Sequence, residues 1–463
     1  MDWTALGHAS WLCEVEGLRL LLDPLLEARH HGGVLEVAPP RRLAAEALRA
    51  DFVLVSHAHP DHFDLDSLAT LARLDPDSVL VTPDPLVEWA GRELGFRTVR
   101  RTAPGQRVDL DGVTLLTTPS LDPDEWGLVV SSREGAAWNQ VDTVLGGVPA
   151  LRRVLETTAA ALGRAPERAL DLALVRWQPL LEVAAQLAEA PGFPYAAYAA
   201  LLAELAALPP GSTLVPTACG ARHTAEHAWL NRFVYPLEEE RFLADLRALR
   251  PDGACCAVVA GDVLRVRGGA VTRDPGAGAA LIADPGAAAP PARYDPFCAP
   301  TLTDPGALAA AERARLRRFL DEELPAALGA AARALDVARE TPLRLALEVV
   351  LPDEERWAQT YLAGPGSCTS EPGLRHDHDA LNRVTGSALA AVLAARSHWG
   401  DALLGGALQA VTRAYRVGPG GLERLPLAPI FLYYALPYDE AFTRSVRARV
   451  SLLRAAGAAK LGA

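Results

Sequence analysis

The chain has 463 residues, of which 50% are hydrophobic and 22% are charged, and 45 Lys and Arg against 57 Asp and Glu leave a net charge of −12. This length indicates roughly two to three domains with room for a large buried core, and the composition excludes a disordered protein. The acidic balance, without basic clusters, argues against nucleic-acid binding. No apolar run is long enough to span a membrane, so a membrane protein is not expected either.

The cysteines indicate the compartment. Six cysteines in a chain of this length are too few for a disulfide framework, and none forms a CxxC pair. No secretory leader precedes the segment that starts at Met1. We therefore expect a cytoplasmic protein in a reducing environment.

The first 145 residues combine short strands with amphipathic helices. Apolar runs bounded by turn residues predict strands at Trp11–Val15, Arg19–Leu22, Phe52–Ser56, Val79–Thr82, Val113–Thr117 and Leu128–Ser132. Apolar residues at three- and four-residue spacing predict helices at Leu43–Ala50, Leu65–Leu74 and Pro85–Leu94. This alternation predicts a sandwich of the α/β or α+β class.

The rest of the chain divides at a segment rich in Gly, Ala, Pro and Asp. We expect a helical insertion at about 147–208, interrupted by a strand at Leu170–Trp177, then strands at Thr213–Pro216 and Cys255–Ala260. A linker is predicted at 271–295, so that residues 1–270 form the catalytic domain and 296–463 a helix-rich C-terminal α+β domain. The predicted elements there are a helix at Ala307–Ala338 broken near Pro325, strands at Leu343–Leu351 and Trp357–Ala363, helices at Asp379–Ala395 and Ala402–Ala414, and a turn at Gly418–Gly421.

The strongest chemical signal is the segment Ser56-His57-Ala58-His59-Pro60-Asp61-His62, directly after the apolar run at 52–55. Residues two apart in an extended segment point to the same side, so His57 and His59 can share one metal ion. Asp61 and His62 follow the strand-breaking Pro60 and can hold a second ion nearby. A solvated loop that happens to be rich in His is the alternative, but three of only 11 His fall here. We therefore predict a metal site.

The segment His57-Ala-His59-Pro-Asp61-His62 resembles the HxHxDH signature of the metallo-β-lactamase superfamily. The segments Gly7-His8-Ala9-Ser10 and Leu22-Asp23-Pro24 are similar to the opening of its lactonase-like and phospholipase-D-like branches. This resemblance implies an α+β fold, the αββα metallo-β-lactamase sandwich, with a dinuclear metal site at one edge. His8 is expected to hold a metal ligand by a hydrogen bond.

A further resemblance touches both domains. Asp23-Pro24, the run 215–220 and the late segment Asn382-Arg383-Val384 with Trp399 are similar to the non-Rieske part of CMP-N-acetylneuraminate hydroxylase-like proteins. This sequence lacks the CxH and CxxH pairs of a Rieske cluster. Any electrons would therefore come from an external donor.

The resemblance implies a ligand set in which one position is altered. Hydrolases of the superfamily usually supply a third His to the first metal, but no His occurs between His62 and His223. We expect Asp122 at that position, with Asp124 and Glu125 as alternatives. Asp142 corresponds to the bridging carboxylate, and the last ligand is His223, with His227 as the alternative. The implied set is His57, His59, Asp122 and Asp142 on one ion and Asp61, His62, Asp142 and His223 on the other, with Asp61 and Asp142 as the catalytic carboxylates.

A carboxylate in place of an imidazole makes the site harder and more anionic, which suits iron or manganese better than zinc. The expected function is that of a dinuclear non-haem iron oxygenase with two Fe ions and O₂ as co-substrate, which hydroxylates or otherwise oxidises a small molecule in a biosynthetic pathway. The same change resembles the dinuclear-iron β-hydroxylase of the chloramphenicol pathway. The alternative is a zinc or manganese hydrolase of a lactone, phosphodiester or amide. Candidates for the substrate pocket are His30, His31, His227 and Trp126.

Overall fold

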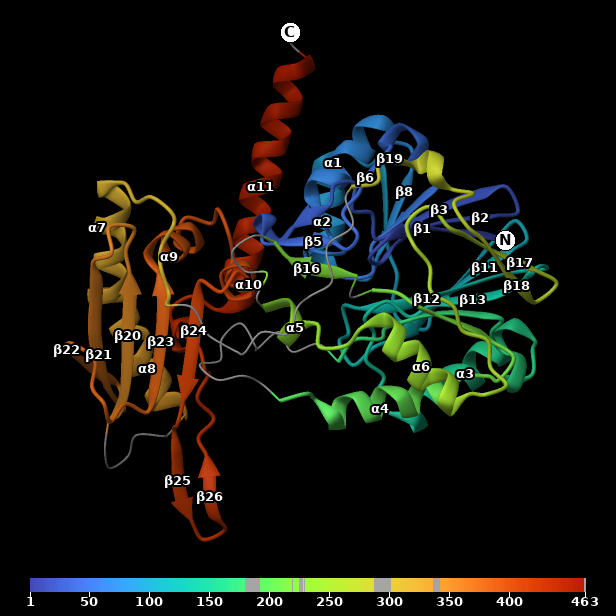
Figure 1. The fold of residues 1–463 in the computed structure, drawn as a ribbon. Coiled ribbons are helices and arrows are strands. Elements are labelled where there is room, and N and C mark those ends of the chain that lie inside the picture. Colours follow the sequence, from blue (N-terminus) through green and yellow to red (C-terminus); the bar gives the residue numbers. More distant parts are fainter. Residues whose placement is uncertain are drawn as a thin grey trace. The chain divides into compact units, whose positions relative to one another are not determined.

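The computed structural model describes residues 1–179, 192–218, 220–224, 228, 230–286, 301–335 and 342–461 (Figure 1). The chain divides into two compact units. The first comprises Met1–Leu181, Phe193–Arg293 and Val450–Ala463, and the second comprises Glu182–Gly192 and Tyr294–Arg449. Among the described residues, no helix is both long and apolar enough to cross a membrane.

Two sheets form the centre of the first unit. One has the order β18-β17-β1-β2-β3-β7-β8-β9 and the other the order β10-β11-β12-β13-β14-β15. The strands of the first sheet are β1 (Asp2–Gly7), β2 (Ser10–Val15), β3 (Leu18–Leu22), β7 (Phe52–Leu54), β8 (Val79–Thr82), β9 (Thr98–Arg101), β17 (Val263–Arg267) and β18 (Ala270–Asp274). Those of the second are β10 (Arg107–Leu110), β11 (Val113–Pro119), β12 (Trp126–Ser132), β13 (Gly135–Asn139), β14 (Leu172–Val175) and β15 (Thr213–Pro216).

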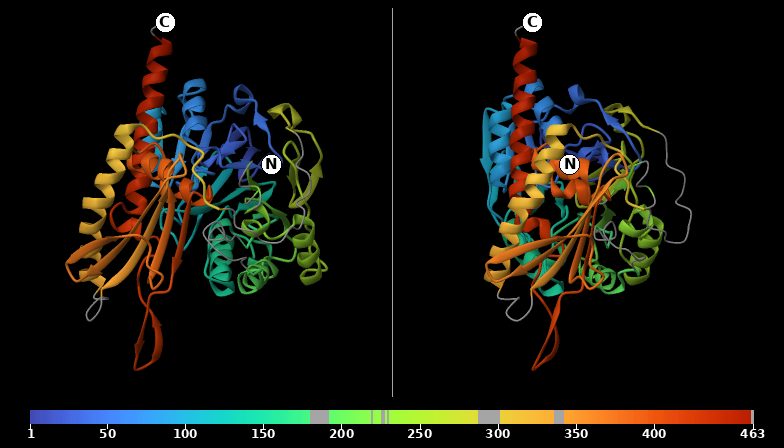
Figure 2. Two further views of the ribbon diagram at one scale, coloured as in Figure 1. Left: turned by 60° about the vertical axis from the view of Figure 1, so that its left-hand side comes forward. Right: turned by 90° about the vertical axis from the view of Figure 1, so that its left-hand side faces the viewer.

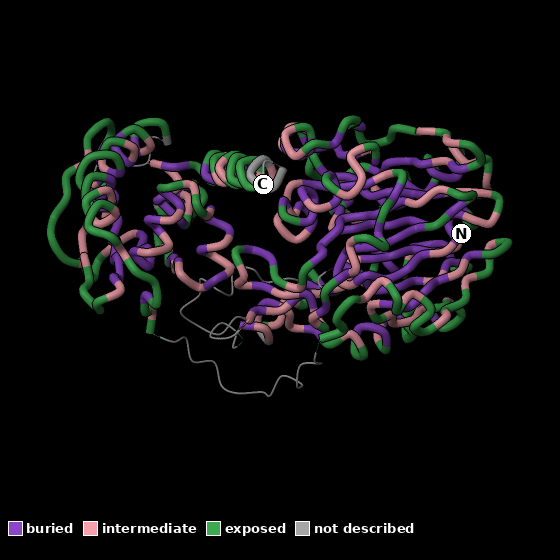
Figure 3. Tube along the Cα trace, turned by 90° about the horizontal axis from the view of Figure 1, so that it is seen from above, coloured by how far each residue is buried: buried purple, intermediate pink, exposed green. Residues whose placement is uncertain are grey.

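The inward faces of the two sheets pack together. Trp3 and Trp11 from the first sheet and Leu128 and Leu172 from the second are at most 1% exposed and belong to one hydrophobic cluster. Alternating side chains of each strand therefore reach this shared core, as sandwich packing requires. Figure 3 shows the strands of this unit as mostly buried segments beneath more exposed helices and loops.

Helices cover both outer faces of the sandwich. Near the first sheet lie α1 (Leu65–Leu74) and α2 (Pro85–Leu94), which begin at the side-chain caps Asp64 and Asp84. Near the second lie α3 (Val148–Leu162), α4 (Tyr195–Ala206) and α6 (Glu239–Leu249), and α5 (Asn231–Val234) is a single turn. Figures 1 and 2 show these two groups on opposite sides of the sheets. The first unit is thus the αββα sandwich that the sequence predicts.

Small pieces of sheet lie at the edge of the first unit. β4 (Arg29–His30), β5 (Leu35–Val37) and β16 (Ala221–His223) form one antiparallel sheet, and β6 (Arg42–Leu43) pairs with β19 (Ile282–Asp284). Leu35 of the middle strand lies opposite His30 on one side and His223 on the other. Directly opposed residues project to the same face of a sheet, so these two histidines share a face.

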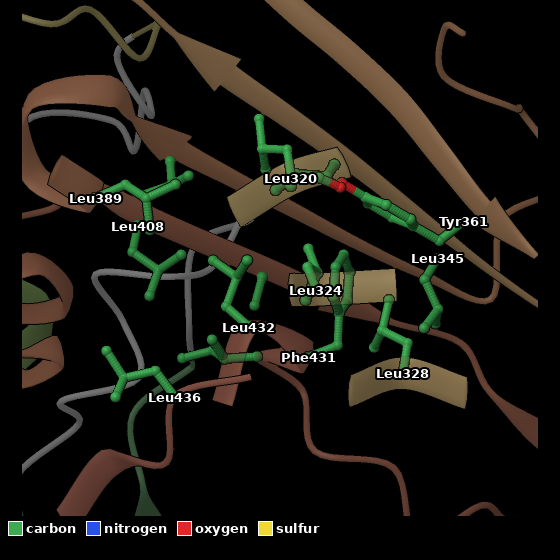
Figure 4. Packing of buried hydrophobic residues seen from close by; sticks show 14 of the residues in the cluster. Leu320, Leu324, Leu328, Leu345, Tyr361, Leu389, Leu408, Phe431, Leu432 and Leu436 are labelled. Atoms are coloured by element: carbon green, nitrogen blue, oxygen red, sulfur yellow. The ribbon is translucent and has the colours of Figure 1, made fainter. Parts of the chain in front are cut away.

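The second unit is an α+β domain built on the sheet β22-β21-β20-β23-β24. Its strands are β20 (Leu343–Val350), β21 (Arg356–Gly364), β22 (Ser367–Pro372), β23 (Ala380–Thr385) and β24 (Leu408–Thr412), with a separate hairpin of β25 (Tyr415–Gly418) and β26 (Gly421–Arg424). Its helices are α7 (Ala310–Arg318), α8 (Leu324–Leu335), α9 (Gly386–Leu393), α10 (Trp399–Leu404) and most of α11 (Tyr438–Leu461), which ends in the first unit. Leucines from α8 and the sheet pack around Phe431 and Tyr361 (Figure 4). The hydroxyl of Tyr361 donates to the carbonyl of Leu320 at 3.0 Å.

Several predicted elements in the first unit differ from the structure. The segment Leu43–Ala50 is a short strand followed by a 3-10 turn (Ala45–Leu48) instead of a helix, and Cys255–Ala260 contributes only an isolated bridge at Cys255. The predicted linker at 271–295 contains most of β18 and all of β19. β18 is recruited by backbone pairing with β17, which lends regular structure to a segment that has little apolar side-chain pattern. By contrast, the strand predicted at Leu170–Trp177 within the helical insertion is confirmed as β14, which pairs with β13 and β15.

The second unit contains strands where helices were predicted. Residues Ala380–Thr385 form β23, which pairs with β20, and a helix begins only at Gly386. Likewise, α10 is followed by β24 within the predicted helix Ala402–Ala414. Both stretches are apolar enough to suit a buried strand or a buried helix, and pairing within the sheet decides between them.

Candidate metal centre

A buried carboxylate fixes the start of the histidine-rich segment. Because β3 and β7 are neighbouring parallel strands, their carboxyl ends bring Asp23 and Ser56 to the same edge of the sheet. The backbone N–H of Ser56 donates to Asp23 Oδ1 at 2.8 Å and its hydroxyl donates to Oδ2 at 2.9 Å. Asp23 is only 1% exposed, so these charge-assisted bonds are shielded from water and set the direction in which the segment leaves β7.

The side chains of His57 and His59 converge. His57 Nε2 and His59 Nδ1 are 2.8 Å apart. His57 is buried and its Nδ1 lies 2.9 Å from the hydroxyl of Ser56, whereas His59 is exposed. One nitrogen of the buried His57 ring therefore lies next to one nitrogen of the exposed His59 ring, as the spacing of the two residues in the sequence predicts.

His62 is the centre of a hydrogen-bonded cluster and is fully buried. Its Nδ1 lies 3.0 Å from Asp23 Oδ2, while its Nε2 lies 3.1 Å from Asp142 Oδ2 and 3.4 Å from Asp61 Oδ2. Asp23 therefore orients the ring so that Nε2 faces the two other carboxylates. The ring centroid of His57 is 4.3 Å from that of His62.

The charges of this cluster depend strongly on one another. Burial by itself lowers the pKa of His62, but the carboxylates of Asp61 and Asp142 raise it well above its usual value. Burial raises the pKa of Asp142, but the imidazole of His62 outweighs this effect and lowers it to about 2. Burial and the neighbouring imidazoles of His62 and His59 lower the pKa of His57. The directions for Asp142 and His57 favour an ionised carboxylate and a neutral imidazole, which are the forms that bind metal ions, whereas His62 has to release its proton when an ion binds to its Nε2.

Further histidines surround Asp61. His8 Nε2 lies 3.0 Å from Asp61 Oδ2, which is the hydrogen bond expected for His8. The ring centroid of His30 is 5.8 Å from that of His8, and His30 Nδ1 lies 2.7 Å from His31 Nδ1. Burial, and then the charge of His31, lower the pKa of His30. The pair His30–His31 is at most 9% exposed, so it forms a buried wall next to Asp61 instead of an exposed loop.

Of the three carboxylates considered for the position of the third histidine, only Glu125 is buried. Asp122, the first choice, is exposed and its Oδ1 accepts the backbone N–H of Asp124, which is also exposed. Glu125 is 9% exposed and accepts the hydroxyl of Ser120 at 3.0 Å, while its Oε1 is buried and has no hydrogen-bond partner among the described residues. Burial and the charge of Asp142 raise its pKa, and the nearby imidazoles of His62 and His59 lower it. Glu125 therefore interacts with the charges of these residues, although it is not one of the most closely grouped donors.

Asp142 lies where the sequence places it, just after β13. The strand ends at Asn139, and Asp142 follows in the next turn. One carboxylate oxygen of Asp142 faces His62, whereas Oδ1 is buried and has no hydrogen-bond partner. An orphaned buried carboxylate oxygen is costly unless a cation or water satisfies it.

Three further residues were predicted at the site, namely His223, Trp126 and His227. His223 is 2% exposed at the end of β16, and its backbone N–H donates to Asn231 Oδ1 at 2.6 Å. Its side chain is not among the most closely grouped metal-donor atoms, which are His57, His62 and Asp142 in one group and His8, Asp61 and His62 in another. Trp126 belongs to the core between the sheets and donates to Thr102 Oγ1 at 3.2 Å, so it is a packing residue and not part of a substrate pocket. His227 lies outside the described residues.

The donor atoms gather in two groups that fit metal binding. Within each group one donor atom per residue lies within 4.8 Å of the others. One group is His57, His62 and Asp142, and the other is His8, Asp61 and His62. Imidazole nitrogens and carboxylate oxygens are ligands for iron, manganese and zinc, so each group fits such an ion. The two groups share His62. The buried Oδ1 of Asp142 has no hydrogen-bond partner among the described residues and is available to an ion.

Sequence reasoning did not assign a role to Asp23. The signal that could have found it is positional, because Asp23 ends an apolar run just as the histidine-rich segment ends another. Carboxyl ends of adjacent parallel strands meet at one edge, so two polar strand ends are candidates for contact. The choice of Glu125 over Asp122 had no such signal.

Residues 3–145 match the family model described as a beta-lactamase superfamily domain. A putative Rieske 2Fe-2S iron-sulfur protein of Mycolicibacterium smegmatis is 32% identical over 155 residues, which are 31% of this chain and 30% of that protein. A metal-dependent hydrolase of Salinibacter ruber is 29% identical over 149 residues, which cover 32% of this chain and 54% of the hydrolase. Among solved structures, the diiron β-hydroxylase CmlA of Streptomyces venezuelae superposes with a TM-score of 0.37 at 14% identity, over 56% of this chain and 53% of CmlA.

The matches to the Rieske-named relatives cover less than half of this chain and less than half of each relative. The chain spans between 30% and 36% of the length of the Rieske-named relatives that it matches. The Rieske name agrees with the resemblance to CMP-N-acetylneuraminate hydroxylase-like proteins that the sequence shows. The αββα sandwich, the intact HxHxDH segment and the family match lead to one conclusion: residues 3–145 of this chain belong to the beta-lactamase superfamily, with the metallo-β-lactamase fold.

Proposed function

We propose that this chain is an oxidoreductase in which a dinuclear iron centre uses O₂ to hydroxylate or otherwise oxidise a small molecule. The proposed ligands are His57, His59, Glu125 and Asp142 for one ion and Asp61, His62, Asp142 and His223 for the other. Glu125 replaces Asp122 in this set because its side chain, unlike that of Asp122, is buried beside Asp142.

The observation that carries this proposal is the buried carboxylate of Glu125. Glu125 is the buried carboxylate of the loop in which the resemblance leads us to expect a replacement for the third imidazole, and its Oε1 has no hydrogen-bond partner among the described residues. In the proposed set, three carboxylates, from Asp61, Glu125 and Asp142, accompany the four imidazoles of His57, His59, His62 and His223. Hard, anionic oxygen donors favour iron or manganese over zinc and stabilise higher oxidation states.

The protein's own groups prepare this centre. Asp23 accepts from Nδ1 of His62 and so keeps Nε2 free to face Asp61 and Asp142. His8 holds the carboxylate of Asp61 from the opposite side. When bound, two ferrous ions supply electrons for the reduction of O₂, and an external donor is needed to restore them.

The setting of the reaction is part of the same proposal. His30 and His31 form the buried wall through which the substrate is recognised. Four described cysteines, at positions 13, 255, 256 and 368, are free thiols, which suits the reducing cytosol that we propose as its location. A biosynthetic pathway is the proposed context.

A metal-dependent hydrolase is the second candidate. The observation that favours it is the similarity of this chain to relatives named metal-dependent hydrolases, such as that of Salinibacter ruber. Two zinc or manganese ions in the same ligand set supply a nucleophile from bound water and polarise the substrate. His30 and His31 would then orient a lactone, phosphodiester or amide.

The metal content of protein produced with iron and zinc both available separates the two candidates. We expect about two irons per chain and a visible absorption that bleaches on reduction and returns with O₂. The variant Glu125→His should shift the bound metal from iron towards zinc, whereas Asp122→His, on the exposed part of the same loop, should leave it unchanged. Two zinc ions in the unsubstituted protein, without a response to reduction, would contradict the oxygenase and support the hydrolase.

A further inference from the structure

A cavity of about 360 Å³ lies between β11 and α3 in the first unit, apart from the donor cluster. Its volume is in the range of small-molecule pockets, which is about 300–1,000 Å³. Leu116, Leu121, Leu145 and Val154 supply apolar surface, and Ser120 and Arg153 lie among the polar residues of the lining. The cavity is therefore large enough for a metabolite with a sizeable apolar part.

Three hydroxyl groups of the lining already have partners. The hydroxyl of Thr117 donates to the carbonyl of Ala103 at 2.7 Å, and that of Thr118 accepts from Trp138 Nε1 at 3.1 Å. The hydroxyl of Ser120 donates to Glu125. Hydroxyl groups that are already hydrogen-bonded offer less to a polar ligand, so the apolar side chains dominate the lining.

The one charged residue among the described residues that line this cavity is Arg153. Arg153 is exposed, and it makes no ion pair or hydrogen bond with the described part of the chain. The start of α3 adds little to this charge, because the backbone N–H groups of Ala150 and Leu151 already donate to the carbonyl of Gly147 and Pro149 has none. A carboxylate placed beside Arg153 would complement its guanidinium.

We propose that this cavity binds a small amphipathic carboxylate, with its apolar body against Leu116 and Val154 and its carboxylate paired with Arg153. The proposal does not depend on which reaction the donor cluster performs. It commits to an anionic ligand because Arg153 is the one charged residue of the lining and has no ion-pair partner in the described part of the chain.

The loops that border the cavity also lead to the donor cluster. Ser120 lies in the lining and contacts Glu125, while the backbone N–H of Leu121 donates to the carbonyl of Val144 at 2.8 Å. Val144 follows Asp142 by two residues, so the same loops carry Glu125 and Asp142.

Titration calorimetry with decanoate on the full chain tests the proposal. We expect saturable binding of one decanoate per chain, and binding about 5- to 10-fold weaker in Arg153→Gln, because an ion pair at the edge of a cavity is lost. The matched control is Arg152→Gln, since Arg152 is also exposed on α3 but does not line the cavity. Ala150→Trp, which fills the space near the helix start, should abolish binding, and decanol should bind more weakly than decanoate.

Chelated protein identifies where the carboxylate binds. If decanoate occupies the cavity, its affinity should survive removal of metal ions by EDTA and still depend on Arg153. Loss of binding after chelation, with no effect of Arg153→Gln, would place the carboxylate on the metal ions and overturn the proposal. Equal weakening by Arg152→Gln and Arg153→Gln would overturn it too, as would the absence of saturable binding.

Discussion

At the scale of single residues, the centre depends on a side chain that orients the proposed metal ligands. Asp23 holds both Ser56, at the start of the histidine-rich segment, and His62, at its end. One buried carboxylate thereby fixes the direction of the backbone and the orientation of an imidazole. Partners of this kind commonly contribute about 10- to 100-fold to metal affinity.

Asp23→Asn should therefore weaken metal binding by about 10- to 100-fold. The carboxylate accepts from the backbone N–H of Ser56 at one oxygen and from His62 Nδ1 at the other, whereas an amide has a single acceptor oxygen and turns its NH₂ group towards one of these donors. The affinity is measured by competition with a chromophoric chelator. Asp77→Asn is the control, since Asp77 is exposed and pairs only with exposed Arg97. An affinity equal to that of the unsubstituted protein would show that Asp23 supports the fold alone.

The sequence predicted where the ligand cluster lies, but not which carboxylate of the loop at 122–125 is buried. The spacing of His57, His59 and His62 after an apolar run was sufficient to locate the centre, and the polar strand end at Asp142 was found by resemblance. The choice between Asp122 and Glu125 depends on which side chain the loop turns inward. Loop conformation leaves no periodic pattern in a sequence, so three neighbouring carboxylates could not be separated.

At the scale of elements, close packing between α2 and β8 makes alanine unfavourable at Gly91, although alanine is usually favoured over glycine inside a helix. A Cβ atom at Gly91 would lie 2.1 Å from Cδ2 of Leu80, whose side chain is buried in the sheet. Alanine usually stabilises a helix interior by roughly 0.5–1 kcal/mol relative to glycine. Here the close approach of helix and strand outweighs that gain.

Gly91→Ala should lower the free energy of unfolding by about 1–3 kcal/mol, because the added methyl group overpacks the contact with Leu80. Gly457→Ala in α11 is the matched variant, since nothing lies within 4 Å of its added Cβ. That change should be neutral or stabilising. Urea unfolding of both variants gives the comparison, and a stabilising Gly91→Ala would contradict the packing argument.

Regular elements were predicted where side-chain periodicity is clear, as in α1 and α2, whose predicted and observed bounds agree. Elements formed through backbone pairing were missed, β18 among them. The segment of β23 was assigned to a helix because an apolar run does not reveal whether a neighbouring strand is present. Local sequence cannot report a partner that is distant along the chain.

At the scale of the whole molecule, the two units have separate hydrophobic cores. The donor cluster lies entirely in the first unit. Ions bound there stabilise the folded state by mass action, by about 2.7 kcal/mol when the free ion exceeds its dissociation constant 100-fold.

Removal of metal ions should therefore lower the local stability of the first unit and leave that of the second unit unchanged. Hydrogen–deuterium exchange after chelation should increase in peptides that contain the segments 52–74 and 119–142, and remain unchanged in β20 and β23 of the second unit. Addition of iron should restore protection. Equal increases in both units would indicate that the ions stabilise the chain as a single cooperative body.

The first unit is discontinuous along the chain, because residues from Val450 onward return to it after the second unit is complete. Arg454 of α11 forms an ion pair there with Glu93 of α2. During translation, this part of the first unit emerges only after the ribosome has made the whole of the second. The sandwich can therefore begin to fold early, but it acquires its last helical segment late, so premature termination within the second unit would leave it without that segment.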